Sequence, residues 1–229
     1  MTRAFMNQLA ELRDRVLENA SSTEELVSLC ERVFPNNRNG ELATLENSAE
    51  GIAARALSIE TDVLKVIASD DAFGDDIHTL CVMLKVSSCF SRVARSTARM
   101  LERASALDEK TLGVYHEQLM PVLSQVMEIV RRAISAFRDR DVEVTRNLIC
   151  EIGAVDATAR EVSRKLFSDA RSRTVTVTDC GQFFRVLNDL ERIAGHARSV
   201  GSALVFRGSE TEPATFAPKI ASAVEFAGG

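Results

Sequence analysis

The side chains that could do chemistry in this chain are three histidines, five cysteines and a stripe of arginines. His78, His116 and His196 lie far apart, and only His78 has a carboxylate three residues before it, at Asp75. A di-iron helical bundle would need two Glu-x-x-His pairs on separate helices, so a ferritin-like oxidase is not expected. The chain has no glycine-rich phosphate loop, nucleophile elbow or HExxH motif. The sequence therefore indicates no active site.

The cysteines do not form a recognisable framework. They are odd in number, widely scattered and without a CxxC pair, so neither a zinc site nor a set of disulfides is indicated. We expect reduced thiols that serve as small hydrophobic side chains in the core.

Four arginines, Arg92, Arg95, Arg99 and Arg103, form a basic stripe at helical spacing. One interpretation is a surface that contacts an acidic partner or phosphate groups. The alternative is a solvated face whose arginines pair with Glu and Asp of neighbouring helices. The spacing alone leaves both open.

Composition is that of a globular protein without a membrane span. Hydrophobic residues make up 45% and charged residues 27%, and no apolar stretch approaches the roughly 18–20 residues that cross a bilayer. The first residues lack the apolar region of a signal peptide, so we expect a cytoplasmic protein, peripheral to the inner membrane only through partners. The net charge of −5 argues against broad nucleic-acid binding.

The elements that would position these residues are helices. Apolar residues recur at steps of three and four almost throughout, as at Met83, Val86, Phe90, Val93 and Thr97. The same pattern predicts six helices, over residues 5–34, 42–68 and 75–106 and around apolar seams at 112–136, 148–166 and 183–204.

Turn signals separate these segments. They are the Pro35–Gly40 turn, the Ser69–Gly74 loop with an N-cap signal, the polar corner at 138–141 and the loop at 174–178. Thr178 or Asp179 is expected to cap the last helix, and Pro121 predicts a kink or a late helix start.

The fold class predicted from these segments is all-α, with two tandem three-helix bundles. Short loops force consecutive helices to alternate in direction, and each helix buries one stripe. We predict a first bundle over residues 1–107, a second over 108–207 and a loosely ordered tail over 208–229. Adjoining bundles of this kind often dimerise through apolar flanks, and the sequence leaves a homodimer open.

An internal repeat supports the two halves. Residues 85–95 and 185–195 read almost as copies, with a basic residue, a valine and an Arg-Val/Ile-Ala triplet at matching positions. A self-match at so long an interval is typical of one supersecondary unit used twice.

The second copy carries a further resemblance. Its segment Leu190-Glu191-Arg192-Ile193-Ala194-Gly195-His196-Ala197 resembles the Leu-Glu-Arg-Ile-Gly/Ala-Asp-His-Ala motif of the PhoU family of phosphate-signalling regulators. The stretches 76–86 and 204–206 also resemble that family, so the likeness extends over nearly the whole chain. It implies tandem three-helix bundles with one such motif on the third helix of each.

The resemblance implies metal sites that this chain keeps only in part. In the PhoU family a Glu/Asp-x-x-x-Asp pattern binds metal clusters, because this spacing puts two carboxylates on one helix face. Glu191 matches the first carboxylate, but Gly195 stands where the second belongs. In the first copy Ser91 replaces the acid, and Arg95 puts a positive charge where a cation would bind.

The family also places an acid on the middle helix of each bundle, which Glu60 and Asp156 match. Asp156 and Glu191 therefore form the candidate for a residual site that holds a divalent or iron-type metal at low occupancy. The alternative is that Glu191 pairs with a nearby arginine. We expect no cofactor.

Functionally, the resemblance implies a non-enzymatic regulator of phosphate uptake and phosphate-responsive signalling. Its partners would be a phosphate-specific ABC transporter, a sensor histidine kinase or both, contacted through a helical surface. The alternatives are a diverged PhoU-like adaptor for another partner or anion transporter, and a metal-dependent enzyme on a helical bundle.

Overall fold

A computed structural model describes residues 3–34, 39–69, 72, 74–107, 109–172 and 174–206. These residues form six long helices: α1 (Arg3–Val33), α2 (Asn39–Ile67), α3 (Asp75–Ser105), α4 (Glu109–Asp139), α5 (Val142–Arg171) and α6 (Val177–Phe206). The described part of the chain contains no strand. The all-α prediction is confirmed.

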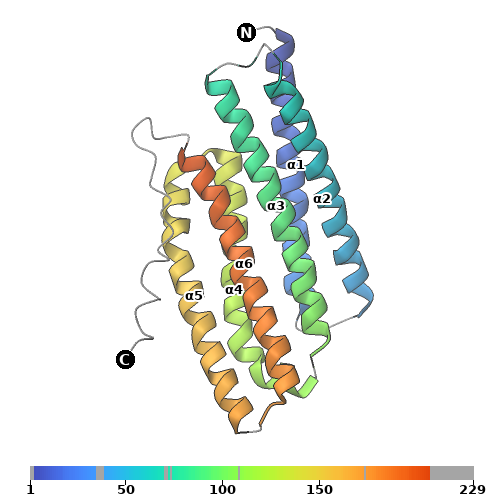
Figure 1. Ribbon diagram of the computed structural model, residues 1–229, viewed down its shortest axis with the longest axis vertical. Coiled ribbons are helices and arrows are strands. Elements are labelled where there is room, and N and C mark those ends of the chain that lie inside the picture. Colours follow the sequence, from blue (N-terminus) through green and yellow to red (C-terminus); the bar gives the residue numbers. More distant parts are fainter. Residues whose placement is uncertain are drawn as a thin grey trace, which may run out of the picture.

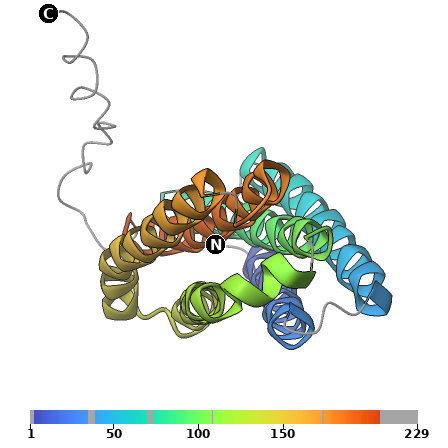
Figure 2. The ribbon, with the colours of Figure 1, turned by 90° about the horizontal axis from the view of Figure 1, so that it is seen from below.

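The helices form two groups of three, α1–α3 and α4–α6, which lie side by side along their length (Figure 1). Seen along the helices, the groups are joined where α3 lies against α6 and α1 lies near α4 (Figure 2). Buried hydrophobic residues from all six helices belong to one cluster. The fold confirms two tandem three-helix bundles, while the division at residue 107 and the homodimer stay predictions.

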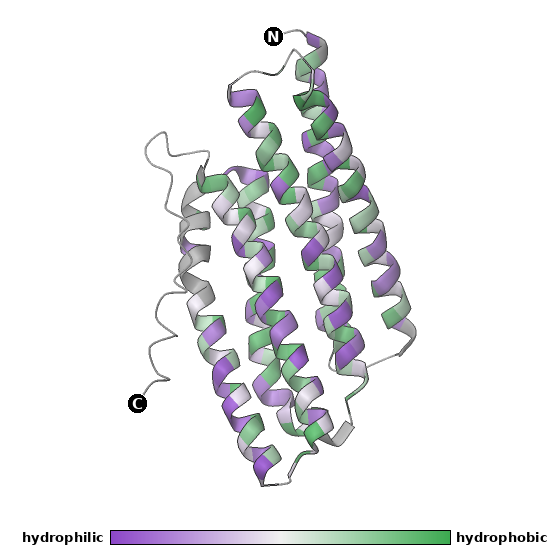
Figure 3. Cartoon of the chain, viewed as in Figure 1, coloured by the Kyte–Doolittle hydropathy of each residue, from purple (hydrophilic) through white to green (hydrophobic). Residues whose placement is uncertain are grey.

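Burial follows the apolar spacing. Met83, Val86, Phe90, Val93 and Thr97 on α3 are all buried. On α6 the matching seam of Val186, Leu190, Ile193, Ala197 and Val200 is buried as well. Hydrophobic and hydrophilic residues alternate along the helices in Figure 3, as expected where one face of each helix is buried.

The ends of two helices differ from the prediction. The N-cap of α3 is Gly74, whose positive φ of 51° suits glycine, and it makes no side-chain capping bond. The cap of α6 is Thr176 and not Thr178 or Asp179, since the Thr176 Oγ1 accepts a 3.0 Å hydrogen bond from the backbone N–H of Asp179. This pair, in which the threonine hydroxyl also donates to the Asp179 carboxylate, fixes the start of α6.

Pro121 does not delay the start of α4, which runs from Glu109 to Asp139 with the proline inside it. The first turns of α4 are inclined to the rest of the helix (Figure 2). A proline removes one backbone hydrogen bond and crowds the carbonyl four residues before it, so a bend in this helix is expected.

The polar corner at 138–141 joins α4 to α5. Arg140 takes a left-handed φ of 57°, and the carboxylate of Asp141 accepts a 3.1 Å hydrogen bond from the backbone N–H of Val144. The prediction of a turn at Pro35 and that of a loose tail over 208–229 lie outside the described residues. Within the described residues, no helix is both long enough and apolar enough to span a membrane.

Candidate functional site

The two motif helices, α3 and α6, lie against each other in opposite directions. The late part of α3 faces the early part of α6, where Arg99 and Arg103 bind Asp189, and the early part of α3 faces the late part of α6. Because the helices are antiparallel, a position late in α3 and its match late in α6 lie toward opposite ends of the pair, while the motif segments near residues 94 and 194 lie toward its middle. This packing brings both copies of the motif together along the junction of the bundles.

Asp189 is the buried charged residue of this junction. Its side chain is 1% exposed and accepts hydrogen bonds from Arg99 at 3.3 Å and Arg103 at 2.5 Å. Two guanidinium groups compensate the cost of burying one carboxylate. Sequence reasoning did not single out Asp189, although an acid within the apolar run of α6 is a signal that could have found it.

The arginine stripe divides into two pairs. Arg99 and Arg103 are half-buried in the ion pairs with Asp189, so for them the interpretation of pairing with a neighbouring helix holds. Arg92 and Arg95 are exposed, and neither forms an ion pair with another described residue. Only Arg92 and Arg95 of the predicted partner-binding set are presented to solvent as free cations.

In the second bundle the structure brings Asp156 of α5 close to Glu191 of α6. Burial raises the pKa of Glu191, and the negative charge of Asp156 raises it further, while Arg160 opposes the shift. Both carboxylates are partly accessible. The two acids that the sequence singled out therefore lie close enough for the charge of Asp156 to raise the pKa of Glu191.

These residues do not complete a metal site. Gly195 supplies no ligand, and Arg160 puts a positive charge near Glu191. Among the described residues there is no group of three or more His, Cys, Asp or Glu side chains placed to hold an ion. The donor set thus does not fit the metal centre that the resemblance implies, and the prediction of little or no metal stays a prediction.

The corresponding place in the first bundle is a depression of about 560 Å³ between α2 and α3. Glu60, Ser91 and Arg95 line it together, as the family pattern places them, and Arg92 lies beside them. Among the described residues, the acids that line it are Glu60 and the exposed Glu50. Arg95 replaces the second carboxylate of the family pattern and Ser91 replaces the first, so a cation there would lose two ligands and meet a positive charge.

An exposed apolar row borders this depression. Leu57 of α2 lines it and is 65% exposed, and Leu64, two turns later on the same helix, is 56% exposed. We call Leu57, Leu64, Arg92 and Arg95 the α2–α3 face. It combines large exposed apolar side chains with unpaired cations, a composition that suits contact with another protein.

The histidines and cysteines add no reactive cluster. Burial lowers the pKa of His196, and the nearby Arg92 and Arg192 lower it further. Burial raises the pKa of Cys30 to about 12 and also raises the pKa of Cys89, so both are unreactive thiols. Cys81 is exposed, which corrects the expectation that it is a core residue, and the side chain of Cys150 lies outside the description.

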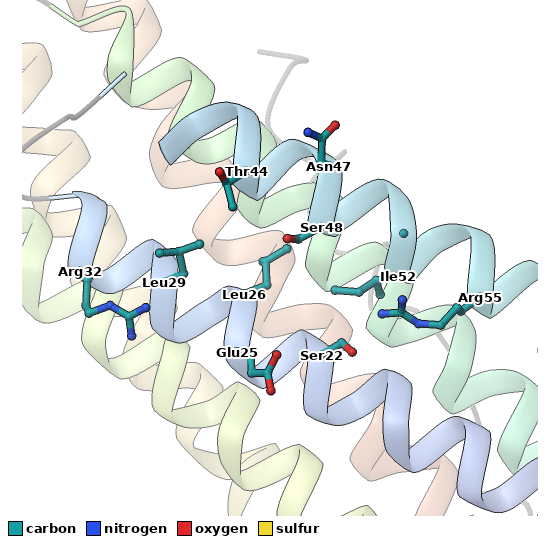
Figure 4. Close-up of a pocket in the computed structure, with 11 residues that line it drawn as sticks. Ser22, Glu25, Leu26, Leu29, Arg32, Thr44, Asn47, Ser48, Ile52 and Arg55 are labelled. Atoms are coloured by element: carbon teal, nitrogen blue, oxygen red, sulfur yellow. The ribbon is translucent and has the colours of Figure 1, made fainter. Parts of the chain in front are cut away.

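A larger cavity, of about 690 Å³, lies between α1 and α2 (Figure 4). Its lining mixes Glu25 and Arg32 with serine, threonine, asparagine and leucine side chains. At its edge the Arg55 Nε donates to the buried amide of Asn19, which itself donates to the Ile52 carbonyl. These bonds tie α1 to α2, and the mixed lining favours no single ligand.

Comparison with known proteins agrees with the sequence resemblance. The family model for the PhoU domain matches residues 121–204. A phosphate-specific transport system accessory protein PhoU homolog of Deinococcus radiodurans is 20% identical over 87% of this chain and 94% of its own length. PhoU homolog 1 of Methanothermobacter thermautotrophicus, named in the same way, is 23% identical over 88% of this chain and 93% of its own length.

Solved structures share the fold. The phosphate transport system regulatory protein PhoU from Streptococcus pneumoniae superposes with a TM-score of 0.81 at 16% identity, over 91% of this chain and 100% of that one. PhoU from Pseudomonas aeruginosa superposes with a TM-score of 0.73 at 17% identity, over 89% of this chain and 98% of that one. The repeated motif helix, the paired three-helix bundles and these likenesses agree: residues 121–204 match the PhoU domain, and the chain resembles PhoU proteins over nearly nine-tenths of its length.

Proposed function

We propose that this protein regulates phosphate transport by direct contact with a phosphate transporter, and that it does so without catalysing a reaction. The observation that carries this proposal is the end-to-end likeness to proteins named as accessory to phosphate-specific transport. That likeness covers nearly nine-tenths of the chain, so it concerns the complete pair of bundles and not one shared helix pair.

The α2–α3 face is the proposed contact surface. Leu57 and Leu64 supply apolar area, and Arg92 and Arg95 supply unpaired cations beside it. A partner that fits would present an acidic segment next to an apolar one. Arginine is enriched at protein–protein contacts, and the buried core of such a contact is more apolar than the rest of the surface. A sensor histidine kinase that presents an acidic segment next to an apolar one would fit the same surface as a further partner.

A co-purification experiment tests this surface. The wild-type chain, immobilised as bait, is expected to retain the detergent-solubilised phosphate transporter of the same cells. The double variant Arg92→Glu, Arg95→Glu should lose most of this retention, because charge reversal turns attraction into repulsion. A matched control reverses Arg164 and Arg171, two exposed arginines of α5, and should retain the transporter. Equal retention by both double variants would exclude the α2–α3 face.

A second candidate is a PhoU-like adaptor for another transporter. The observation that favours it is the divergence of the motif, with Ser91, Arg95 and Gly195 in place of carboxylates. Retention of another membrane transporter by the wild-type chain, with no phosphate transporter recovered, would favour this candidate over the first.

A further inference from the structure

A groove of about 550 Å³ runs between the early part of α3 and the late part of α6. Val82 and Lys85 of α3 line one side, and Gly195, Arg198, Ser202 and Ala203 of α6 line the other. This volume lies within the range of about 300–1,000 Å³ that is typical of pockets for small molecules. The groove is separate from the α2–α3 face and from the Asp156–Glu191 pair.

The groove results from a difference between the two copies of the repeat. Its α6 wall carries Gly195, Ser199 and Ala203, where α3 carries arginines at the matching positions 95, 99 and 103. At the opposite end of the helix pair, Arg99 and Arg103 fill the junction and bind Asp189. Small side chains leave the equivalent volume open on the α6 side.

The groove is positively charged. Lys85 and Arg198 line it and His78 lies with them, and no Asp or Glu is among the described residues that line it. Neither Lys85 nor Arg198 forms an ion pair with another described residue. Unpaired cations that flank a concave surface concentrate anions there. An arginine guanidinium in particular can bind two oxygens of a phosphate or carboxylate at once.

The rest of the lining is less polar. Val82 and Ala203 provide apolar wall, and the Ser202 hydroxyl can donate a hydrogen bond. Inorganic phosphate would contact only a small part of a 550 Å³ groove and would leave this apolar wall in water. An anion with an organic body would cover both kinds of surface.

We propose that this groove binds a small organic anion with a phosphate monoester head, which lies between Lys85 and Arg198 while its apolar body packs against Val82 and Ala203. A dianionic head suits a groove lined by two cations better than a single carboxylate does. The proposal does not depend on the identity of the protein partner.

Calorimetric titration of the full chain tests the proposal, with phenyl phosphate as the probe. We expect a Kd below about 1 mM for phenyl phosphate and at least about tenfold weaker binding of inorganic phosphate. Lys85→Met and Arg198→Met should each weaken phenyl phosphate binding at least about tenfold. Arg192→Met, which removes an exposed arginine of α6 outside the groove, is the matched control and should leave binding unchanged.

The variant Gly195→Arg distinguishes binding inside the groove from general attraction of an anion to positive charge. Outside its own helical turn, a Cβ at Gly195 meets no described atom within 4 Å, so the variant should fold, which circular dichroism can check. Because the new arginine fills the groove, we expect weaker binding despite the added charge. Stronger binding by Gly195→Arg, equal binding of inorganic phosphate, or no effect of Lys85→Met and Arg198→Met would each overturn the proposal.

Cys81 provides a second measurement, since its exposed side chain lines the same groove. Phenyl phosphate is expected to slow alkylation of Cys81 at concentrations near its Kd, whereas inorganic phosphate at the same concentration should not. Unchanged alkylation at saturating phenyl phosphate would place the probe elsewhere and contradict the proposal.

Discussion

Arg103 of α3 donates a 2.5 Å hydrogen bond to Asp189 of α6, across the junction of the two bundles. Asp189 is almost fully buried, whereas Arg103 remains about one-third exposed. The partly exposed guanidinium of Arg103 thus neutralises the negative charge of Asp189 inside the junction. Arg99, one turn earlier, adds a second bond to the same carboxylate. This contact fixes how α3 and α6 lie against each other and, with them, the placement of both motif copies.

Replacing Asp189 by alanine should therefore destabilise the whole protein. The substitution leaves two partly buried guanidinium groups without their acceptor, and we expect the free energy of unfolding to fall by about 2–3 kcal/mol. Urea denaturation measures this loss. The comparison variant is Asp62→Asn, which removes the surface ion pairs with Arg15 and Lys65 and should cost less than about 1 kcal/mol. Similar losses for both variants would contradict a special role of the junction contact.

Glu191→Gln should stabilise the protein at neutral pH. The pKa of Glu191 is raised in the folded state by burial and by Asp156, so the protonated form favours folding. That stability is fully present below the unfolded pKa of about 4.5 and is lost as the pH rises through the folded pKa. At pH 7 the variant, which lacks the charge, should be more stable by less than about 1 kcal/mol.

Thermal unfolding at pH 7 and pH 4 checks this dependence. The difference between Glu191→Gln and wild type should be present at pH 7 and should shrink at pH 4. A variant less stable than wild type at pH 7 would show that attraction to Arg160, and not repulsion by Asp156, dominates at Glu191.

Gly195→Asp should restore a metal-binding carboxylate. It places an acid four residues after Glu191 on the same helix face, and outside its own helical turn no described atom lies within 4 Å of the added Cβ. We expect Mn²⁺ or Zn²⁺ to bind this variant at least about tenfold more tightly than wild type. Gly195→Asn has nearly the same shape without the charge and should behave like wild type. Tight binding of one metal equivalent by the wild-type chain would contradict the incomplete donor set.

Thiol labelling should separate the exposed cysteine from the buried ones. Iodoacetamide is expected to modify Cys81 in the native protein, since its side chain is exposed. Cys30 should react only after unfolding in urea, because it is buried and its pKa is raised to about 12. Mass spectrometry of the labelled peptides distinguishes the two, and native labelling of Cys30 would show that α1 does not pack as described.

The helices could be predicted because apolar spacing reports directly which face of a helix is buried. The seam from Met83 to Thr97 is an example, and every residue in it is buried. Helix ends were less predictable, because they depend on single side-chain bonds. Thr176 caps α6 through a bond to Asp179, whereas the sequence offered Thr178 and Asp179 with equal force.

The candidate site was predictable only in part. The family motif located Glu191 and Asp156, and the structure brings these two together. The arginine stripe could not be divided from sequence, because Arg99 and Arg103 find their acceptor on a helix nearly ninety residues away. Which arginines pair and which remain free depends on the register of α3 against α6, and no local pattern encodes that register.

Phosphate uptake by living cells tests the proposed function most directly. Cells whose own copy of the protein carries Arg92→Glu and Arg95→Glu are compared with wild-type cells and with cells carrying the paired reversal of Arg164 and Arg171. If the α2–α3 face contacts the transporter, the first strain should lose regulation of uptake in high phosphate as fully as a deletion strain, while the purified variant keeps the thermal stability of wild type. Normal regulation in that strain, with the variant protein present at wild-type levels, would contradict the proposed mode of action.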